Sequence, residues 1–295
     1  MPNVIQVKSI LNKTKRRDPW FLDDYTINAY SGCSFNCLYC YIRGSKYGIH
    51  MEEKLAIKEN ALELLDKQLF NRAKKGQYGI IVMSSATDPY LHFESEYRLT
   101  RQMLELILKY RFPVHIITKS DLVVRDIDLL QQINENAILP VDLTGKLLHK
   151  TLVTFSFSTV DDAIASIFEP GATPPSIRVE TMRNIAATGL YTGVSMMPLL
   201  PYISDTAAHL DLMFKTFKEA AARYVFPATI TLFGNGTADS KTLVLRAIEK
   251  HYPHLLDRYH QLFADATQLP AYYNNAFNAK ASELCNKYDI PNRIF

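Results

Sequence analysis

Three cysteines lie close together near the start of the chain. Cys33, Cys37 and Cys40 fall within eight residues with the spacing C-x3-C-x2-C, whereas the fourth cysteine, Cys285, is far away in the sequence. A short loop can deliver three thiolates to one metal centre without help from the rest of the fold. On a four-iron cluster, three thiolates leave one iron open to an exogenous ligand, which is what a catalytic cluster needs.

The spacing separates an iron-sulfur site from its alternatives. A zinc site of paired cysteines needs a second pair, or histidines, further along the chain. This chain has no second pair, and its eight histidines show no paired ligand spacing. A disulfide framework needs an even set of cysteines in a secreted chain, and we see no signal-peptide pattern. The pattern favours a catalytic iron-sulfur cluster, with a zinc site and incidental thiols as alternatives.

The cysteine motif resembles that of a known family. With the aromatic Tyr39 before its last cysteine, it is similar to the signature of radical S-adenosylmethionine (radical SAM) enzymes. Further motifs resemble the spore photoproduct lyase-like branch, also described as DNA repair photolyase-like, over roughly residues 20 to 205. They are Asp88-Pro89, Thr118-Lys119, Phe157-Ser158, Phe168-Glu169-Pro170-Gly171 and Arg178.

The resemblance implies a role for each matched residue. Cys33, Cys37 and Cys40 would bind three irons of a [4Fe-4S] cluster, and the amino and carboxylate groups of S-adenosylmethionine would chelate the fourth. Lys119 would meet the methionine carboxylate, which suits a point positive charge. The other residues expected at the cofactor are Thr87, Asp88, Ser158 and Arg178, and the contact made by Arg178 stays open between cofactor, substrate and Glu169.

The reaction implied by the family is reductive cleavage of S-adenosylmethionine. An electron from an external flavodoxin- or ferredoxin-like donor would release methionine and a 5′-deoxyadenosyl radical, which abstracts a substrate hydrogen. Tyr39 and Tyr41 flank the last cysteine and are the candidate catalytic residues, because the lyase-like branch has tyrosines there that can relay a hydrogen atom. Their alternative role is ring packing over the cluster.

One departure from the branch concerns the substrate. Spore photoproduct lyase is expected to carry a cysteine where this chain has Ser85, preceded by Ser84. A serine hydroxyl is a far poorer hydrogen-atom donor than a thiol, so we expect no repair of spore photoproduct by the lyase's own route. The substrate is therefore unidentified, and a nucleic acid is one candidate.

A basic and aromatic segment precedes the cysteines. Residues 8–20 include Lys13, Lys15, Arg16, Arg17 and Trp20. Such a cluster is typical of nucleic-acid contact, but a solvated arm is the simpler interpretation and the one we favour. The net charge of +3 is too small to decide between them.

The elements that must position these residues read as alternating strands and helices. We expect six strands, at residues 26–29, 79–84, 114–118, 152–158, 192–196 and 229–233, with helices such as 61–74 and 210–221 between them. Six units are too few for a closed eight-stranded barrel, so the sequence predicts a partial (β/α)6 TIM-type barrel. Polar residues follow the first four strands, at the edge where parallel sheets carry their chemistry.

The chain divides into three parts by composition. We predict an N-terminal basic arm over residues 1–24, the barrel over 25–235, and a C-terminal helical extension over 236–295 that begins near Gly234-Asn235-Gly236. Nearly half of the 295 residues are hydrophobic, enough for a full core. No apolar run approaches the roughly 20 residues of a membrane span, so we expect a cytoplasmic enzyme without membrane contact. The alternative is a non-catalytic iron-sulfur electron-transfer or binding protein.

Overall fold

A mostly parallel sheet forms the centre of the molecule. The computed structural model describes residues 2–45, 55–83, 87–264 and 266–295. Six parallel strands follow one another across the sheet in chain order, and a short antiparallel strand, β2 (Asn12–Lys13), extends it beside the first. The parallel strands are β3 (Tyr25–Ile27), β6 (Ile81–Met83), β7 (Val114–Thr118), β8 (Thr151–Ser156), β9 (Tyr191–Leu199) and β10 (Val225–Thr229). Because β2 and β10 are unpaired on their outer sides in the described sheet, the predicted partial barrel is confirmed.

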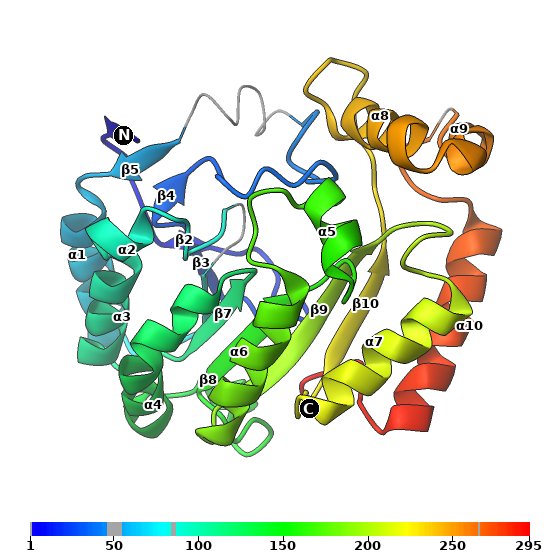
Figure 1. The fold of residues 1–295 in the computed structure, drawn as a ribbon. Helices are drawn as coiled ribbons and strands as arrows, with labels where there is room; N and C mark the ends of the chain where they lie inside the picture. Colours follow the sequence, from blue (N-terminus) through cyan, green and yellow to red (C-terminus); the bar gives the residue numbers. More distant parts are fainter. Residues whose placement is uncertain (1, 46–54, 84–86, 265) are drawn as a thin grey trace.

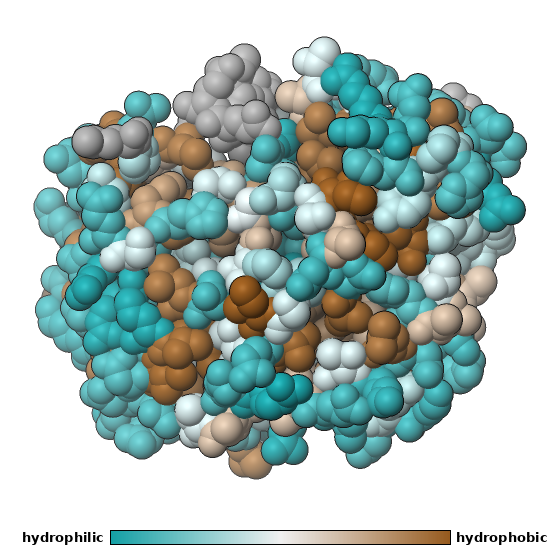
Figure 2. Space-filling view, in the orientation of Figure 1, coloured by the Kyte–Doolittle hydropathy of each residue, from teal (hydrophilic) through white to brown (hydrophobic). Residues whose placement is uncertain are grey.

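Helices cover the outer face of this sheet (Figure 1). The face that they present to solvent is largely hydrophilic, with separate small hydrophobic patches (Figure 2). The main helices are α1 (Ala61–Lys74), α3 (Leu99–Lys109), α4 (Ile127–Asn136), α6 (Pro175–Ala187) and α7 (Ala207–Glu219). Shorter elements are α2 (Glu94–Tyr97), α5 (Asp162–Phe168) and the 3-10 helices η1 (Asp121–Asp126) and η2 (Val141–Leu143).

The last barrel strand lies earlier than the sequence predicts. We expected it at residues 229–233, but β10 runs from Val225 to Thr229 and contains Pro227. A proline cannot donate a ladder hydrogen bond, so its presence argued against a strand there. The strand tolerates Pro227 because it lies at the edge of the sheet, paired only with β9 among the described strands.

Side chains on the two faces of the sheet enter two different cores. Val153 and Phe155 of β8 pack in the large core between sheet and helices. Leu152, on the opposite face of the same strand, packs inside the barrel with Tyr224 and Phe226. Both faces of the strand are therefore buried, as is usual for parallel sheets that are covered by helices.

The segment before β3 forms the floor of the barrel. Trp20 stacks on Phe226 of β10 with ring centroids 5.3 Å apart, and Phe21 meets the same ring edge-on at 5.7 Å. Arg17 forms ion pairs with Asp24, at 2.7 Å, and with Asp142. Arg17 and Trp20 are therefore packed against the barrel, so the expectation of a solvated arm is wrong for these two residues. The arm links the first barrel strand to the last.

The C-terminal residues cover the free edge of β10. They form α8 (Ser240–His251), η3 (Pro253–Leu255), α9 (Leu256–Leu262) and α10 (Ala271–Tyr288). Helix α10 packs on α7 and β10. The backbone N–H of Val225 donates to the carbonyl of Pro291 at 2.9 Å, and the Thr229 hydroxyl donates to Asn274 at 2.7 Å. These contacts satisfy groups that an exposed edge would leave open to another chain.

A second, three-stranded sheet lies beside the barrel. Its strands are β1 (Asn3–Ile5), β5 (Ala56–Lys58) and β4 (Tyr30–Ser31), in the order β1-β5-β4. Strand β4 leads directly into the cysteine segment. None of the helices described is both long and apolar enough to cross a membrane.

A buried histidine couples the floor to the barrel wall. His115 of β7 donates from Nδ1 to the Phe21 carbonyl at 2.8 Å, and its Nε2 accepts from the Thr154 hydroxyl at 2.5 Å. The Thr154 hydroxyl in turn accepts from Tyr224, at 2.7 Å. Burial lowers the pKa of His115 to about 4, and the bond to Phe21 opposes this only in part. The histidine is neutral in the folded protein at neutral pH.

Because His115 is buried in its neutral form, we predict that the free energy of unfolding decreases as the pH is lowered from 7 to 5. Between about pH 6.5 and 4 the unfolded chain binds a proton at His115 and the folded protein does not, which costs about 3 kcal/mol when complete. The free energy of unfolding, measured in urea at pH 7 and pH 5, should fall less in His115→Gln than in the wild type. An equal fall in both proteins would contradict this assignment.

Candidate active site

A cavity of about 540 Å³ opens inside the barrel, between the cysteine segment and the inner face of the sheet. Its wall is built from the carboxyl ends of the strands, including Ser156 of β8, Ser195 of β9 and Thr229 of β10. Its lining includes eight of the residues that the sequence predicts for the site: Cys33, Cys37, Tyr39, Cys40, Tyr41, Thr87, Asp88 and Lys119. The other two, Ser158 and Arg178, lie behind the wall and are fully buried.

The cysteine segment is held from both sides. Asn36, between the first two cysteines, has a φ of 52°, which lets the chain turn sharply. Arg43, just after the third, is 2% exposed and donates from Nε to the Cys37 carbonyl at 3.1 Å. The same guanidinium donates to the carbonyl of Ala238 at 3.2 Å. The loop is thereby tied to the residues that precede α8.

Burial raises the pKa of all three cysteine thiols, that of Cys33 to about 12. Backbone N–H groups oppose this, from Phe35 and Asp88 at Cys33 and from Ile42 and Arg43 at Cys40. N–H groups directed at cysteine sulfur stabilise thiolates and tune the potential of an iron-sulfur cluster. No set of three His, Cys, Asp or Glu side chains in the described ranges is placed to hold a single metal ion. A four-iron cluster instead binds each thiolate at a different iron.

Two polar atoms at the cavity have no hydrogen-bond partner among the described residues. They are Nζ of Lys119 and Oγ1 of Thr87, and both are buried. Buried polar atoms are nearly always hydrogen-bonded, so such atoms in a cavity indicate groups that a ligand satisfies. An ammonium and a hydroxyl beside three thiols fit a cofactor with a carboxylate.

Asp88 fixes the position of Lys119. Its carboxylate accepts from the Thr118 hydroxyl and the Lys119 backbone N–H, each at 2.7 Å, and from the Tyr90 N–H at 2.9 Å. Burial raises the pKa of Asp88, although these hydrogen bonds oppose the effect. Asp88 therefore joins the carboxyl ends of β6 and β7 and sets the backbone from which Lys119 extends.

Glu169 is a site residue that was named from the sequence only within a motif and as one possible partner of Arg178. Its carboxylate accepts from the Ser158 hydroxyl at 2.6 Å and from the hydroxyl of Tyr39. It pairs with Arg178 and lies 3.4 Å from Nζ of Lys119. Burial alone would raise the pKa of Glu169, but the two cations and the two hydroxyls lower it to about 2.

The contacts of Glu169 locate two of the residues predicted to bind the cofactor. Ser158 donates to Glu169, and Arg178 is divided between Glu169 and the backbone carbonyl of Ser156. Among the contacts that the sequence left open for Arg178, the structure contains the one with Glu169. In the sequence, Glu169 is a charged residue between the apolar Phe168 and Pro170, and an arginine, Arg178, follows nine residues later. That combination could have indicated a buried ion pair.

The segment around Glu169 also clamps the cysteine loop. The N–H of Leu38 donates to the Phe168 carbonyl at 2.9 Å, and the N–H of Gly171 donates to the Phe35 carbonyl at 3.0 Å. A Cβ on Gly171 would lie 2.5 Å from the Ser34 carbonyl oxygen. The two chains approach so closely that only glycine fits.

The two tyrosines next to the last cysteine differ in exposure. Tyr39 is 4% exposed, whereas Tyr41 is 57% exposed. Tyr41 lines the cavity and is also exposed to solvent. Ser84 and Ser85, at the place of the expected hydrogen donor, lie outside the described residues.

The comparisons with known proteins agree with this geometry. The family model described as the radical SAM superfamily matches residues 27–213. An uncharacterized protein of Mycobacterium tuberculosis is 26% identical over 273 residues, covering 90% of this chain and 75% of its own. An uncharacterized protein of Methanocaldococcus jannaschii is 29% identical over 205 residues, covering 68% of each chain. A radical SAM Nα-GlyT isomerase of Pseudomonas phage M6 is 23% identical over 198 residues, covering 66% of this chain and 38% of its own.

Among solved structures, spore photoproduct lyase complexed with dinucleoside spore photoproduct has the same fold. It superposes with a TM-score of 0.66 at 14% identity, over 97% of this chain and 78% of the lyase. The agreement extends to the C-terminal helices as well as the barrel.

The clamp predicts a specific effect of a small substitution. In Gly171→Ala the new methyl group overlaps backbone atoms of Ser34 and Phe35, so the cysteine loop must move. We expect a loss of about 1–3 kcal/mol of stability and less iron per chain after anaerobic reconstitution. Gly76→Ala is the control, because its φ of +64° makes alanine unfavourable while its Cβ meets no atom within 4 Å. Full iron content in Gly171→Ala would show that the loop does not depend on the clamp.

Proposed function

Because the matched segment spans more than half of the chain, this protein belongs to the radical SAM superfamily, and we propose that it cleaves S-adenosylmethionine reductively at a [4Fe-4S] cluster. The bound cluster and cofactor would supply a 5′-deoxyadenosyl radical for hydrogen abstraction from a substrate. The observation that carries the proposal is the cavity shared by the three cysteines and the Lys119 ammonium, which has no hydrogen bond among the described residues.

Different residues of the cavity would bind the cluster and the cofactor. Cys33, Cys37 and Cys40 would hold the cluster, and Lys119 would bind the carboxylate of S-adenosylmethionine, which a buried cation attracts strongly. The Thr87 hydroxyl, which has no partner in the described part of the chain, would form one hydrogen bond with the cofactor. These contacts would hold the cofactor against the barrel wall, where a substrate can be placed next to it.

Ser158 and Arg178 would support the cofactor through Glu169, and Asp88 through the backbone of Lys119. Tyr39 and Tyr41 are the candidates for hydrogen-atom relay. Of the two, Tyr41 is the better placed to meet a substrate, since Tyr39 is buried and donates to Glu169.

The partners follow from this chemistry. The cluster needs an external one-electron donor, and we propose a flavodoxin- or ferredoxin-like protein. A reducing cytoplasm suits four free thiols and an iron-sulfur cluster. The alternative is a non-catalytic iron-sulfur electron-transfer or binding protein. It supplies no hydrogen-bond partner for the buried ammonium of Lys119, which has none among the described residues.

Cofactor cleavage tests the proposal directly. The protein is reconstituted anaerobically with iron and sulfide, incubated with S-adenosylmethionine and dithionite, and assayed for 5′-deoxyadenosine by chromatography. We expect cleavage by the wild type, none by Cys37→Ala, and a decrease of roughly tenfold or more in Lys119→Met, which loses a buried charged contact. A loaded cluster without cleavage in the wild type would favour the non-catalytic alternative.

A nucleic acid is our candidate substrate. The solved spore photoproduct lyase holds a dinucleoside, and Lys13, Lys15 and Arg16 are exposed on the arm of this chain. If these three residues neutralise phosphates, replacing all three by alanine should reduce the slope of log affinity against log salt by roughly 2 to 3 for duplex DNA. Binding by the wild type that does not change with salt would exclude this contact.

A further inference from the structure

We propose that Glu169 is a positioning residue of the cofactor site, which orients Lys119 and Tyr39 without touching the cofactor. This inference rests on the proposed function and identifies how the site is kept in its geometry. Glu169 does not line the cavity, and its side chain is fully buried. Its effect on any bound molecule must therefore pass through the residues that it holds.

Glu169 joins four separate segments of the chain. The loop after α5 supplies Glu169 itself, the cysteine loop supplies Tyr39, the end of β7 supplies Lys119, and α6 supplies Arg178. Ser158, just after β8, adds a fifth segment and a fourth contact, at 2.6 Å. A single carboxylate thus sets the distance between the metal-binding loop and the cation expected at the cofactor.

Glu169 could act on Lys119 in two ways, by neutralising its charge or by holding its ammonium in position. Arg178 and Lys119 are two cations facing one carboxylate, and Lys119 is the one that lines the cavity. Arg178 is fully buried and lies over the Phe157 ring at 4.9 Å, whereas 12% of the Lys119 side chain is exposed. If Glu169 acted only as a counter-charge, its removal would strengthen the binding of an anionic group by Lys119. If it positions Lys119, its removal should weaken that binding.

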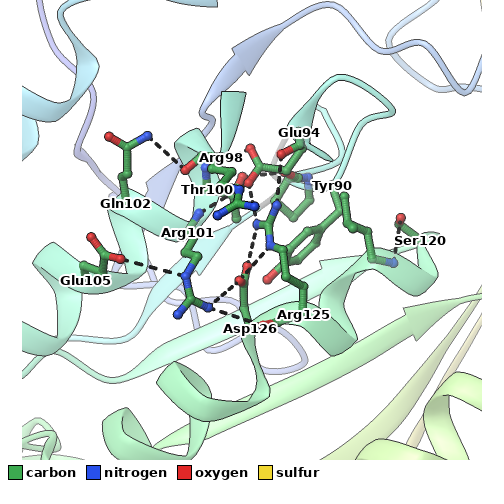
Figure 3. A network of polar contacts seen from close by, with 12 residues as sticks. Tyr90, Glu94, Arg98, Thr100, Arg101, Gln102, Glu105, Ser120, Arg125 and Asp126 are labelled. Carbon is green, nitrogen blue, oxygen red and sulfur yellow. Dashed lines mark hydrogen bonds and ion pairs between the residues drawn. The ribbon is translucent and has the colours of Figure 1, made fainter. Parts of the chain in front are cut away.

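A second buried network in the molecule provides a matched control. Glu94 of α2 is also fully buried, accepts from a tyrosine hydroxyl, that of Tyr30, and pairs with an arginine, Arg125, at 2.6 Å. Figure 3 shows this network, in which Arg125 of η1 bonds to both Glu94 and Asp126. Glu94 does not line the cavity. The two glutamates therefore match in burial and in the types of their partners, and differ in whether those partners belong to the site.

The experiment compares Glu169→Gln with Glu94→Gln in the reconstituted full chain. The measurements are iron per chain, the melting temperature, and the dissociation constant for S-adenosylmethionine by equilibrium dialysis without reductant. We expect both variants to bind similar amounts of iron and to lose stability alike. We expect only Glu169→Gln to weaken the binding of S-adenosylmethionine, by roughly tenfold or more, as found when outer contacts of a ligating group are removed. Glu169→Asp, which keeps the charge, should recover part of the affinity.

Each other outcome has a defined meaning. Unchanged or tighter binding in Glu169→Gln, or an equal loss in Glu94→Gln, would overturn the positioning role. Should Glu169→Gln fail to fold, Glu169→Asp and Tyr39→Phe take its place, and wild-type affinity in both would overturn it as well. If the wild type itself binds no S-adenosylmethionine, the proposed function fails, and that result is seen before any variant is compared.

Discussion

The geometry of the site depends on one buried, ionised carboxylate. A charged group deprived of water is costly unless cations and hydrogen bonds replace its hydration. Glu169 meets this requirement with Arg178, Lys119, Ser158 and Tyr39, which come from different parts of the chain. Because each partner must reach the same two oxygen atoms, the cysteine loop, the ends of two strands and helix α6 cannot move independently. The need to satisfy one charge therefore fixes the position of the cysteine loop relative to the strand end that carries Lys119.

An open barrel would otherwise be a weak support for such a site. Its sheet has two free edges, and its interior must be filled without blocking the cavity. The chain meets both needs with its termini. The segment around Trp20 and Phe21 fills the floor and contacts β10, and the residues around Pro291 bond to the outer side of the same strand. The carboxyl ends of the strands remain accessible, and the cavity lies there.

Local patterns predicted the parts of the fold that local interactions determine. Strand 114–118 and helix 61–74 are observed with the expected bounds, because a β-branched run and an apolar stripe are visible within a short window. The cysteine motif and Lys119 could be found in the same way. Strand β10 was misplaced because Pro227 is acceptable only at a sheet edge, and edge position is a property of the whole sheet. Glu169 was named only as a possible partner of Arg178, because its place in the site depends on a partner 130 residues away in the sequence, Tyr39.

The networks around Glu94 and Glu169 differ in whether all their charged groups are hydrogen-bonded within the protein. Around Glu94 the positive charges of Arg101 and Arg125 are paired, because these arginines bond to the carboxylates of Glu94, Asp126 and Asp128. Around Glu169 the balance is incomplete, because Lys119 keeps an ammonium with no hydrogen bond among the described residues. Burying a charged donor in this way costs free energy, at least the 1–3 kcal/mol typical of an unsatisfied buried polar group. A carboxylate bound at Lys119 would recover that free energy by supplying the missing hydrogen bond.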